Sequence, residues 1–376
     1  MGSLALSDAH AFISDPIRRE LRVFELAQED PRWERFVADN PNALPYHHPI
    51  WFQMLRETFG YKPAALGCEG SDGCLSGVLP MLEKRSLLAG LHLSSLPNTP
   101  VAGPLASDEE SLRALLSAAM SRVDHCSVRW LQLKSPSPAL GGLADGLGRF
   151  AWDATYVLDM PDDPGKLRLG NSHNRYNIRA ALRKAIRSGV TVRDASSLDD
   201  VRRWYHLYLG TVRAHSIPPR PFRMFELIWE LLEPQGRARL LLAERRTGGR
   251  TQVLAGTVFL FHGRTVMAAF NGRDRSQLEF FPNFVIHWKA ITEACSAGFR
   301  RYDLGEVPLG NDGLAHFKMK WGAKPVELYR YHYPRAGGLE RGTLGVGHLP
   351  PAAKWAWRRL PLSVTAVLGR WIYRRL

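Results

Sequence analysis

Hydrophobic and polar positions alternate along the first 160 residues in a way that predicts a mixture of helices and strands. Helical spacing of apolar residues appears over 49–55 and 109–123, and strand-like runs occupy 76–81, 128–133 and 153–159. The segment 96–104 is rich in proline and glycine and predicts a long loop. These elements together predict an α/β layered arrangement for the first part of the chain.

The second part begins with an amphipathic helix. Asn171, Ser172 and His173 are suited to cap its start. Apolar residues then recur three and four positions apart, at Ile178, Ala181, Leu182, Ala185 and Ile186. We expect this face to lie on a core. Further along, the pattern predicts strands over 190–192, 238–244, 254–262, 265–270 and 301–304, and helices over 198–214, 222–232 and 283–297.

This order of elements is that of the GNAT acyltransferase fold, and the first part of the chain can be interpreted as a looser copy. A length of 376 residues also exceeds the usual size of one core. We therefore predict an α/β (layered α+β) protein with a tandem GNAT-like fold, in which two lobes have mixed sheets flanked by helices. The expected parts are an N-terminal tail (1–20), a first lobe (21–160), a second lobe (161–334) and a C-terminal tail (335–376).

The charge of the chain points to a polyanionic partner. The formal net charge is +14, which suits nucleic acid, an anionic membrane surface or a phosphate-bearing substrate without choosing among them. After Pro334, eight Lys or Arg residues stand against one acid, Glu340, and are interleaved with Trp and Tyr. We expect this basic tail to bind an anionic membrane surface.

The expected location is the cytoplasm, with a peripheral position on the inner face of the cell membrane as a further expectation from the tail. No stretch of 18 apolar residues could form a spanning helix, and the first residues lack the pattern of a signal peptide. The four cysteines form no C-x-x-C pair, and the histidines lack zinc-ligand spacing. We therefore expect neither a disulfide scaffold nor a metal site.

A chain of motifs resembles the FemA/FemB/FemX-like transferases, which form peptidoglycan bridges, and in particular their exopolysaccharide- and exosortase-associated subgroup. The motifs occur in family order over residues 165–333, and the first half adds the weaker entry motif His48-Pro49-x-Trp51. The second-half motifs are Arg175-Tyr176-Asn177-Ile178-Arg179, Asn271, Pro282-Asn283, Tyr302-Asp303 and the run from Gly313 to Gly322.

The resemblance implies an enzyme that transfers an aminoacyl or acyl group to an amine. Such a reaction passes through a tetrahedral oxyanion, which a positive group can stabilise. Lys318 matches the position at which the family carries a lysine proposed for that role, with Phe317 beside it as a wall of the donor site. The alternative is that Lys318 is a solvated helix residue and that Phe317 and Trp321 serve packing rather than substrate recognition.

Asp303 and Asn271 are further candidates that the patterns leave open. Asp303 ends a strand before a glycine, so it could orient or deprotonate the attacking amine or could cap the following turn. Asn271 ends another strand, where it could bond to substrate or start a hairpin turn with Gly272.

A positive stripe on the helix after residue 171 is a candidate for binding phosphates. Arg175, Arg179 and Arg183 recur every four residues along it. A solvated helix flank would show the same spacing, so the pattern leaves both interpretations open.

The donor loop differs from that of GNAT enzymes that use acetyl-CoA. Their loop has glycines that let backbone N–H groups cradle the pyrophosphate, whereas residues 275–283 here contain Leu278, Glu279 and Phe280 at that place. We therefore expect no tightly bound cofactor, an aminoacyl-tRNA donor and a phosphate-bearing or lipid-linked glycan precursor as acceptor.

Two alternatives to this function stay open. One is an N-acyltransferase that uses acyl-CoA or an acyl carrier protein on an amino sugar during exopolysaccharide synthesis. The other is a non-catalytic assembly factor at the membrane surface.

Overall fold

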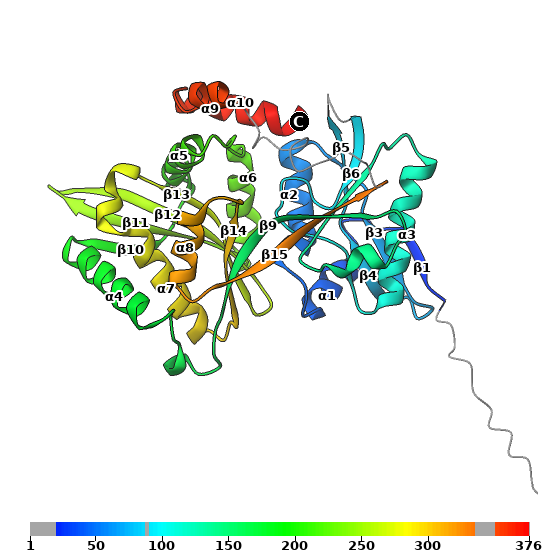
Figure 1. Cartoon of the computed structure of the whole chain (residues 1–376), viewed down its shortest axis with the longest axis horizontal. Coiled ribbons are helices and arrows are strands. Elements are labelled where there is room, and N and C mark those ends of the chain that lie inside the picture. Colours follow the sequence, from blue (N-terminus) through cyan, green and yellow to red (C-terminus); the bar gives the residue numbers. More distant parts are fainter. Residues whose placement is uncertain (1–19, 87–89, 335–349, 376) are drawn as a thin grey trace, which may run out of the picture.

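One continuous sheet joins the two halves of the chain. The computed structural model describes residues 20–86, 90–334 and 350–375. Within them, an 11-stranded sheet has the order β10-β11-β12-β13-β14-β9-β15-β8-β6-β5-β2, and Figure 1 shows β9 and β15 crossing the middle of the molecule. Because the sheet continues through these two strands, the two halves share a rigid frame.

The strands of the large sheet come from both lobes. From the first lobe come β2 (Lys62–Pro63), β5 (Leu82–Ser86), β6 (Gly90–Ser94), β8 (Leu131–Ser135) and β9 (Gly148–Asp159). From the second come β10 (Val190–Asp194), β11 (Ala238–Thr247), β12 (Arg250–His262), β13 (Thr265–Arg273), β14 (Arg301–Val307) and β15 (Lys324–Tyr333). β15 pairs with β9 on one side and with β8 on the other, so the last strand of the second lobe completes the sheet of the first.

Helices cover both faces of the second-lobe part of the sheet. They are α4 (Ser172–Arg187), α5 (Leu198–Ala214), α6 (Phe222–Leu227, continued by a π-helical turn over Ile228–Leu232), α7 (Pro282–Ser296) and α8 (Asp312–Lys320). Along β11, Leu240 and Leu242 belong to one core and Leu241 and Ala243 to another. This alternation buries both faces of the strand.

The amphipathic helix expected after residue 171 is confirmed, with one exception. Asn171 caps α4 by accepting a hydrogen bond from the Asn174 N–H, and Ile178 and Ala185 are buried. Ile186 was expected on the same face, but its side chain is 66% exposed. Ile186 follows Ala185 directly, and this step around the helix takes its side chain beyond the buried face of α4.

The first lobe adds a smaller sheet and three helices. The small sheet has the order β1-β3-β4-β7, from β1 (Arg22–Glu25), β3 (Leu66–Glu69), β4 (Leu75–Leu79) and β7 (Leu105–Ala106). The helices are α1 (Pro31–Asp39), α2 (Pro49–Phe59) and α3 (Glu109–His125). The loop expected over 96–104 is confirmed, whereas β5, β6 and β15 had not been predicted.

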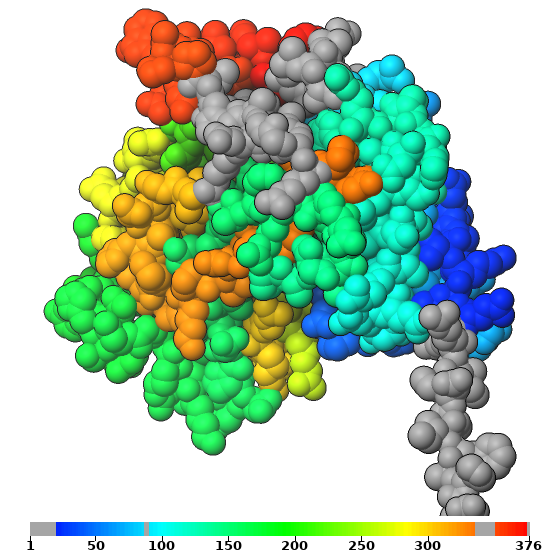
Figure 2. Space-filling view, turned by 45° about the vertical axis from the view of Figure 1, so that its right-hand side comes forward, coloured from blue at the N-terminus to red at the C-terminus, as the bar shows by residue number. Residues whose placement is uncertain are grey.

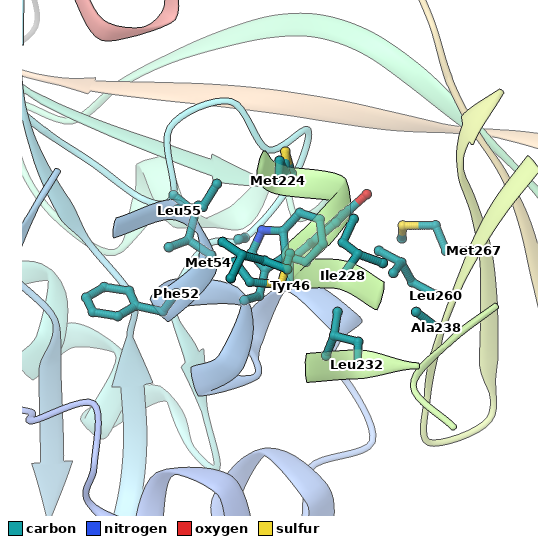
Figure 3. Close-up of a cluster of buried hydrophobic side chains, with 14 of the residues drawn as sticks. Tyr46, Phe52, Met54, Leu55, Met224, Ile228, Leu232, Ala238, Leu260 and Met267 are labelled. Carbon is teal, nitrogen blue, oxygen red and sulfur yellow. The ribbon is translucent and has the colours of Figure 1, made fainter. Parts of the chain in front are cut away.

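A shared hydrophobic cluster holds the lobes together. Phe52, Met54 and Leu55 of α2 belong to the same buried cluster as Met224 of α6 and Leu260 of β12. Figure 3 shows these side chains meeting between the ribbons of the two lobes. Removal of so much apolar surface from water stabilises the relative position of the lobes.

Two short helices end the chain. They are α9 (Pro351–Trp357) and α10 (Leu362–Arg375), with Pro361 between them. Figures 1 and 2 show them as a red layer on the surface above α5. No helix within the described ranges is long and apolar enough to cross a membrane.

The close approach of α5 to β13 requires glycine at position 272. A Cβ there would lie 2.6 Å from the backbone nitrogen of Tyr208, which a small side-chain movement cannot relieve. We predict that Gly272→Ala lowers the free energy of unfolding by about 1–3 kcal/mol through overpacking. Gly210→Ala is the matched control, because nothing lies within 4 Å of a Cβ added there on α5.

Alanine has the higher helix propensity, so Gly210→Ala should raise the free energy of unfolding by up to about 1 kcal/mol. Denaturant titration of both variants measures the difference. Equal stabilities for the two variants would contradict the close packing of α5 on β13.

Candidate functional site

A cavity of about 1540 Å³ lies between the two lobes. Its walls include Tyr46 and Trp51 from the first lobe and Phe270, Asn271 and Lys318 from the second. We call it the interlobe cavity. Its mixture of apolar and aromatic walls with a few charged groups is that of a substrate site.

The second-lobe end of the cavity lies where two parallel strands separate. β13 and β14 pair only at Thr265–Arg301, Val266–Tyr302 and Met267–Asp303, although both strands continue beyond these pairs. Gly305 follows the last pair with a φ of +87°, a conformation that favours glycine. Its carbonyl and that of Glu306 are therefore not part of a β13–β14 ladder.

Lys318 lies in this opening. Its side chain is 6% exposed, and its Nζ donates to the carbonyl oxygens of Gly305 at 2.7 Å and Glu306 at 3.1 Å. One ammonium N–H is left for another acceptor. Burial lowers the pKa of Lys318 to about 8, opposed by the nearby carboxyl groups of Asp303 and Glu306. The side chain is thus not a solvated helix lysine.

Asp303 lies beside Lys318 in the cavity wall. Its Oδ1 accepts hydrogen bonds from Thr155 Oγ1 at 2.5 Å and from the Gly305 N–H at 2.7 Å. Within the described part of the chain, Oδ2 has no hydrogen-bond partner. Burial raises the pKa of Asp303, although these donors and Lys318 oppose the shift. Oδ1 thus caps the following turn, whereas the proton-accepting role of Asp303 stays a prediction.

Two further predicted site residues line the cavity. Asn271 donates through Nδ2 to Thr257 Oγ1 at 2.9 Å and to Asn283 Oδ1 at 3.2 Å, rather than starting a hairpin turn. Phe317 lines the cavity and packs edge-on against Phe284, with ring centroids 5.4 Å apart. Lys318, Asp303, Asn271 and Phe317 are therefore brought together at one end of the cavity.

The other four predicted residues lie elsewhere. Trp321 has no exposed surface and fills the core between Phe284 and His287, so it does not line the cavity. Arg175, Arg179 and Arg183 lie on α4 and are not among the cavity residues. Since α4 covers the sheet beside α7 and β10, its arginines form a separate basic surface.

Sequence patterns missed a group of buried cations in the cavity. Lys134 is 5% exposed and donates to the carbonyls of Leu96 and Thr99, and burial lowers its pKa well below the usual value. Arg220 donates to the Asn98 carbonyl at 2.5 Å, and its buried Nε has no hydrogen-bond partner among the described residues. The only sequence signal was the polar alternation of Gln132 and Lys134 in β8, and Arg220 stands in a proline-rich loop that carried none.

No cluster of three or more metal-ligating side chains occurs among the residues that the structure describes.

The donor loop, over residues 275–283, has no open cradle for a pyrophosphate. Its two aromatic side chains contact cations: the Arg245 guanidinium lies 4.0 Å from the Phe280 ring centroid, and the Lys184 ammonium lies 5.3 Å from that of Phe281. α7 then begins with Pro282, which has no N–H to offer a phosphate.

The sequence profile of the acetyltransferase (GNAT) domain matches residues 172–319, which include β13, β14 and Lys318. This part of the chain is therefore similar to a GNAT acetyltransferase domain. The protein is accordingly an acyltransferase, as the resemblance implied. No curated protein sequence is significantly similar to the chain.

Solved structures extend the GNAT likeness over both lobes. FemX has a TM-score of 0.64 at 17% identity, over 84% of this chain and 98% of FemX. The C-terminal domain of a putative lysylphosphatidylglycerol synthetase from Agrobacterium fabrum has a TM-score of 0.53 at 14% identity, over 81% and 91%. A tandem GNAT protein from the clavulanic acid biosynthesis pathway has a TM-score of 0.50 at 14% identity, over 85% and 99%. The predicted tandem GNAT-like fold is therefore confirmed.

We predict that Lys318→Met lowers kcat for acyl transfer by roughly 10²-fold or more, as loss of one oxyanion donor does in other enzymes. A lysine with a pKa of about 8 loses its charge as the pH rises above 8, so kcat of the unaltered protein should fall there. The Met variant should lack this fall. Lys320→Met is the control, since Lys320 is on the same helix but outside the cavity. Normal kcat in Lys318→Met would exclude the role.

Proposed function

We propose that this protein transfers an aminoacyl group, or a related acyl group, from a tRNA ester to an amine on a phosphate-bearing cell-envelope glycan precursor. One observation carries the proposal: the buried Lys318 ammonium lies at the β13–β14 opening, beside the Asp303 carboxyl group, in the interlobe cavity. Acyl transfer to an amine needs both a group that stabilises the oxyanion and one that accepts the amine proton.

The roles of the two residues follow from the atoms that make no hydrogen bond with the described residues. The third N–H of Lys318 is available to the oxygen that becomes negative when the amine attacks the acyl carbon. Asp303 Oδ2 accepts a proton from the amine, and its raised pKa makes it a better base than an exposed carboxylate. The amide bond forms as the C–O bond of the ester breaks, and the ester oxygen leaves with the proton that Asp303 accepted, so the donor is released as an alcohol.

The donor loop supports tRNA over coenzyme A. Phe280 and Phe281 are held by Arg245 and Lys184, and Pro282 removes an N–H from the start of α7. A coenzyme A pyrophosphate would need those N–H groups. The basic surface of Arg175, Arg179 and Arg183 is on the same side, since α4 contacts both this loop and α8. It suits the phosphates of an RNA acceptor stem.

The cavity wall also favours an anionic ligand. Arg220 and Arg273 line the cavity, and the Nε atom of each is buried without a hydrogen-bond partner in the described residues. A buried polar group without a partner is unfavourable, and a phosphate oxygen would satisfy it. These two atoms support a phosphate-bearing ligand in the cavity, as the proposed acceptor would be.

The donor can be tested directly. The purified protein is incubated with charged tRNA or with acyl-CoA, each with an amino-sugar acceptor, and donor deacylation is followed with and without RNase. We expect turnover with charged tRNA that RNase abolishes. Turnover with acyl-CoA that RNase does not affect would overturn the tRNA donor and favour N-acylation of an amino sugar in exopolysaccharide synthesis.

We further propose that the C-terminal helices hold the protein on an anionic membrane. Residues 350–375 contain six Lys or Arg residues and no acid. Apolar side chains stand out beside them, with Trp355 59%, Val367 60% and Trp371 48% exposed. Such an amphipathic surface suits the lipid interface, where each cation contributes about 1 kcal/mol. Residues 335–349 of the predicted tail lie outside the described residues.

This attachment predicts that the double variant Val367→Ser/Trp371→Ser loses binding to vesicles that contain phosphatidylglycerol. Both side chains are on the exposed side of α10, so the cavity should be unaffected. Ile186→Ser is the matched control, because it removes an equally exposed apolar side chain from α4. Vesicle flotation measures the bound fraction. Equal flotation of the double variant and the control would contradict the proposal.

A further inference from the structure

The first-lobe end of the interlobe cavity has a sheet face as its floor. Five neighbouring strands form it, in the order β9-β15-β8-β6-β5. Lys84 is opposite His92, and Gln132 is opposite both Ser94 and His332. Residues opposite one another across a sheet share a face. These five side chains all line the cavity. We call this surface the sheet floor.

The reverse face of the same strands is ordinary core. Leu93 of β6, Leu131 and Leu133 of β8, and Tyr331 of β15 are fully buried in one hydrophobic cluster. Alternation along the strands therefore separates an apolar face from a polar one. If the protein's own core covered the sheet floor, that face would be apolar as well. Its polar side chains therefore indicate contact with a polar ligand.

Hydrogen-bonding groups on the sheet floor are left available. Lys84 makes no hydrogen bond or ion pair with the described residues, and burial lowers its pKa only to about 8, so it stays largely charged at neutral pH. The Nε2 of His332 lies 3.1 Å from Gln132 Nε2, but its buried Nδ1 has no hydrogen-bond partner in the part of the chain that the structure describes. Lys134 lies nearby and gives two of its three N–H groups to backbone carbonyls.

Flat rings flank these polar groups. The His92 ring stacks on Trp130, with centroids 4.1 Å apart and planes 7° apart. Trp130 and Phe150 lie 5.6 Å and 5.2 Å from the His332 ring. Aromatic faces pack against the C–H faces of a sugar ring, while imidazole and amide groups bond to its hydroxyls. The cation next to them would take an acidic substituent.

We propose that the sheet floor binds an acidic sugar, that is, a pyranose ring bearing a carboxylate or a phosphate group. The ring lies against Trp130, His92 and Phe150, and the acidic group is held by the Lys84 ammonium. The assignment of this sugar to the acceptor rests on the proposed function. Its binding to the sheet floor does not.

Binding can be measured without any acyl donor, so its outcome is separate from that of the transfer reaction. The full chain is titrated calorimetrically with glucuronate, glucose 1-phosphate and glucose. We expect both acidic sugars to bind more tightly than glucose, and the comparison between them distinguishes a carboxylate from a phosphate ligand. Lys84→Met should weaken the preferred acidic sugar about tenfold, or about 1.4 kcal/mol, and leave glucose unchanged.

Lys62→Met is the matched control. Lys62 is on the adjacent strand β2, is exposed, and pairs with Glu83, so its side chain belongs to the opposite face from Lys84. Phe150→Ala removes a ring and should weaken all three sugars. Thermal unfolding of each variant verifies its fold. Equal affinity for glucose and the acidic sugars, or equal loss in Lys62→Met and Lys84→Met, would overturn the proposal.

Discussion

The pairing of β15 with β9 and β8 is the constraint on which the rest of the structure depends. β15 belongs to the end of the second lobe in sequence but lies between two first-lobe strands. Its backbone hydrogen bonds therefore make one sheet of two lobes. A hinge between the lobes would have to break this ladder, so the two ends of the interlobe cavity are held at a constant separation. A two-substrate reaction benefits from such fixed positions.

The same backbone arrangement occurs twice along this sheet with different outcomes. β6 and β8 run parallel for two residue pairs, as β13 and β14 do for three. In the first lobe, Lys134 donates to the carbonyls of Leu96 and Thr99, and a Cβ on Gly103 would lie 2.7 Å from the Lys134 carbonyl. The loop therefore fills that opening. In the second lobe, Lys318 lies in the equivalent opening and faces the cavity.

Buried cations concentrate in the cavity rather than in the cores. Lys318 and Lys134 each give two N–H groups to backbone carbonyls, which offsets part of the cost of taking an ammonium out of water. Carbonyl oxygens carry only partial charge, so the pKa of each lysine stays below its ordinary value. Among the residues that line the cavity, Lys and Arg outnumber Asp and Glu, which favours anionic ligands.

Local patterns in the sequence were enough to determine most helices and the GNAT order of the second lobe, because amphipathic spacing and capping are local properties. Lys318, Asp303, Asn271 and Phe317 were found through motifs and do meet at one site. Only the tertiary structure decided that Trp321 belongs to the core and that the α4 arginines lie on a separate surface, since the same helical spacing serves both outcomes. It also decided that Lys84, Lys134 and Arg220 line the cavity. Their surroundings come from strands and loops far apart in the chain, and burial by distant segments leaves no periodic signal in a sequence.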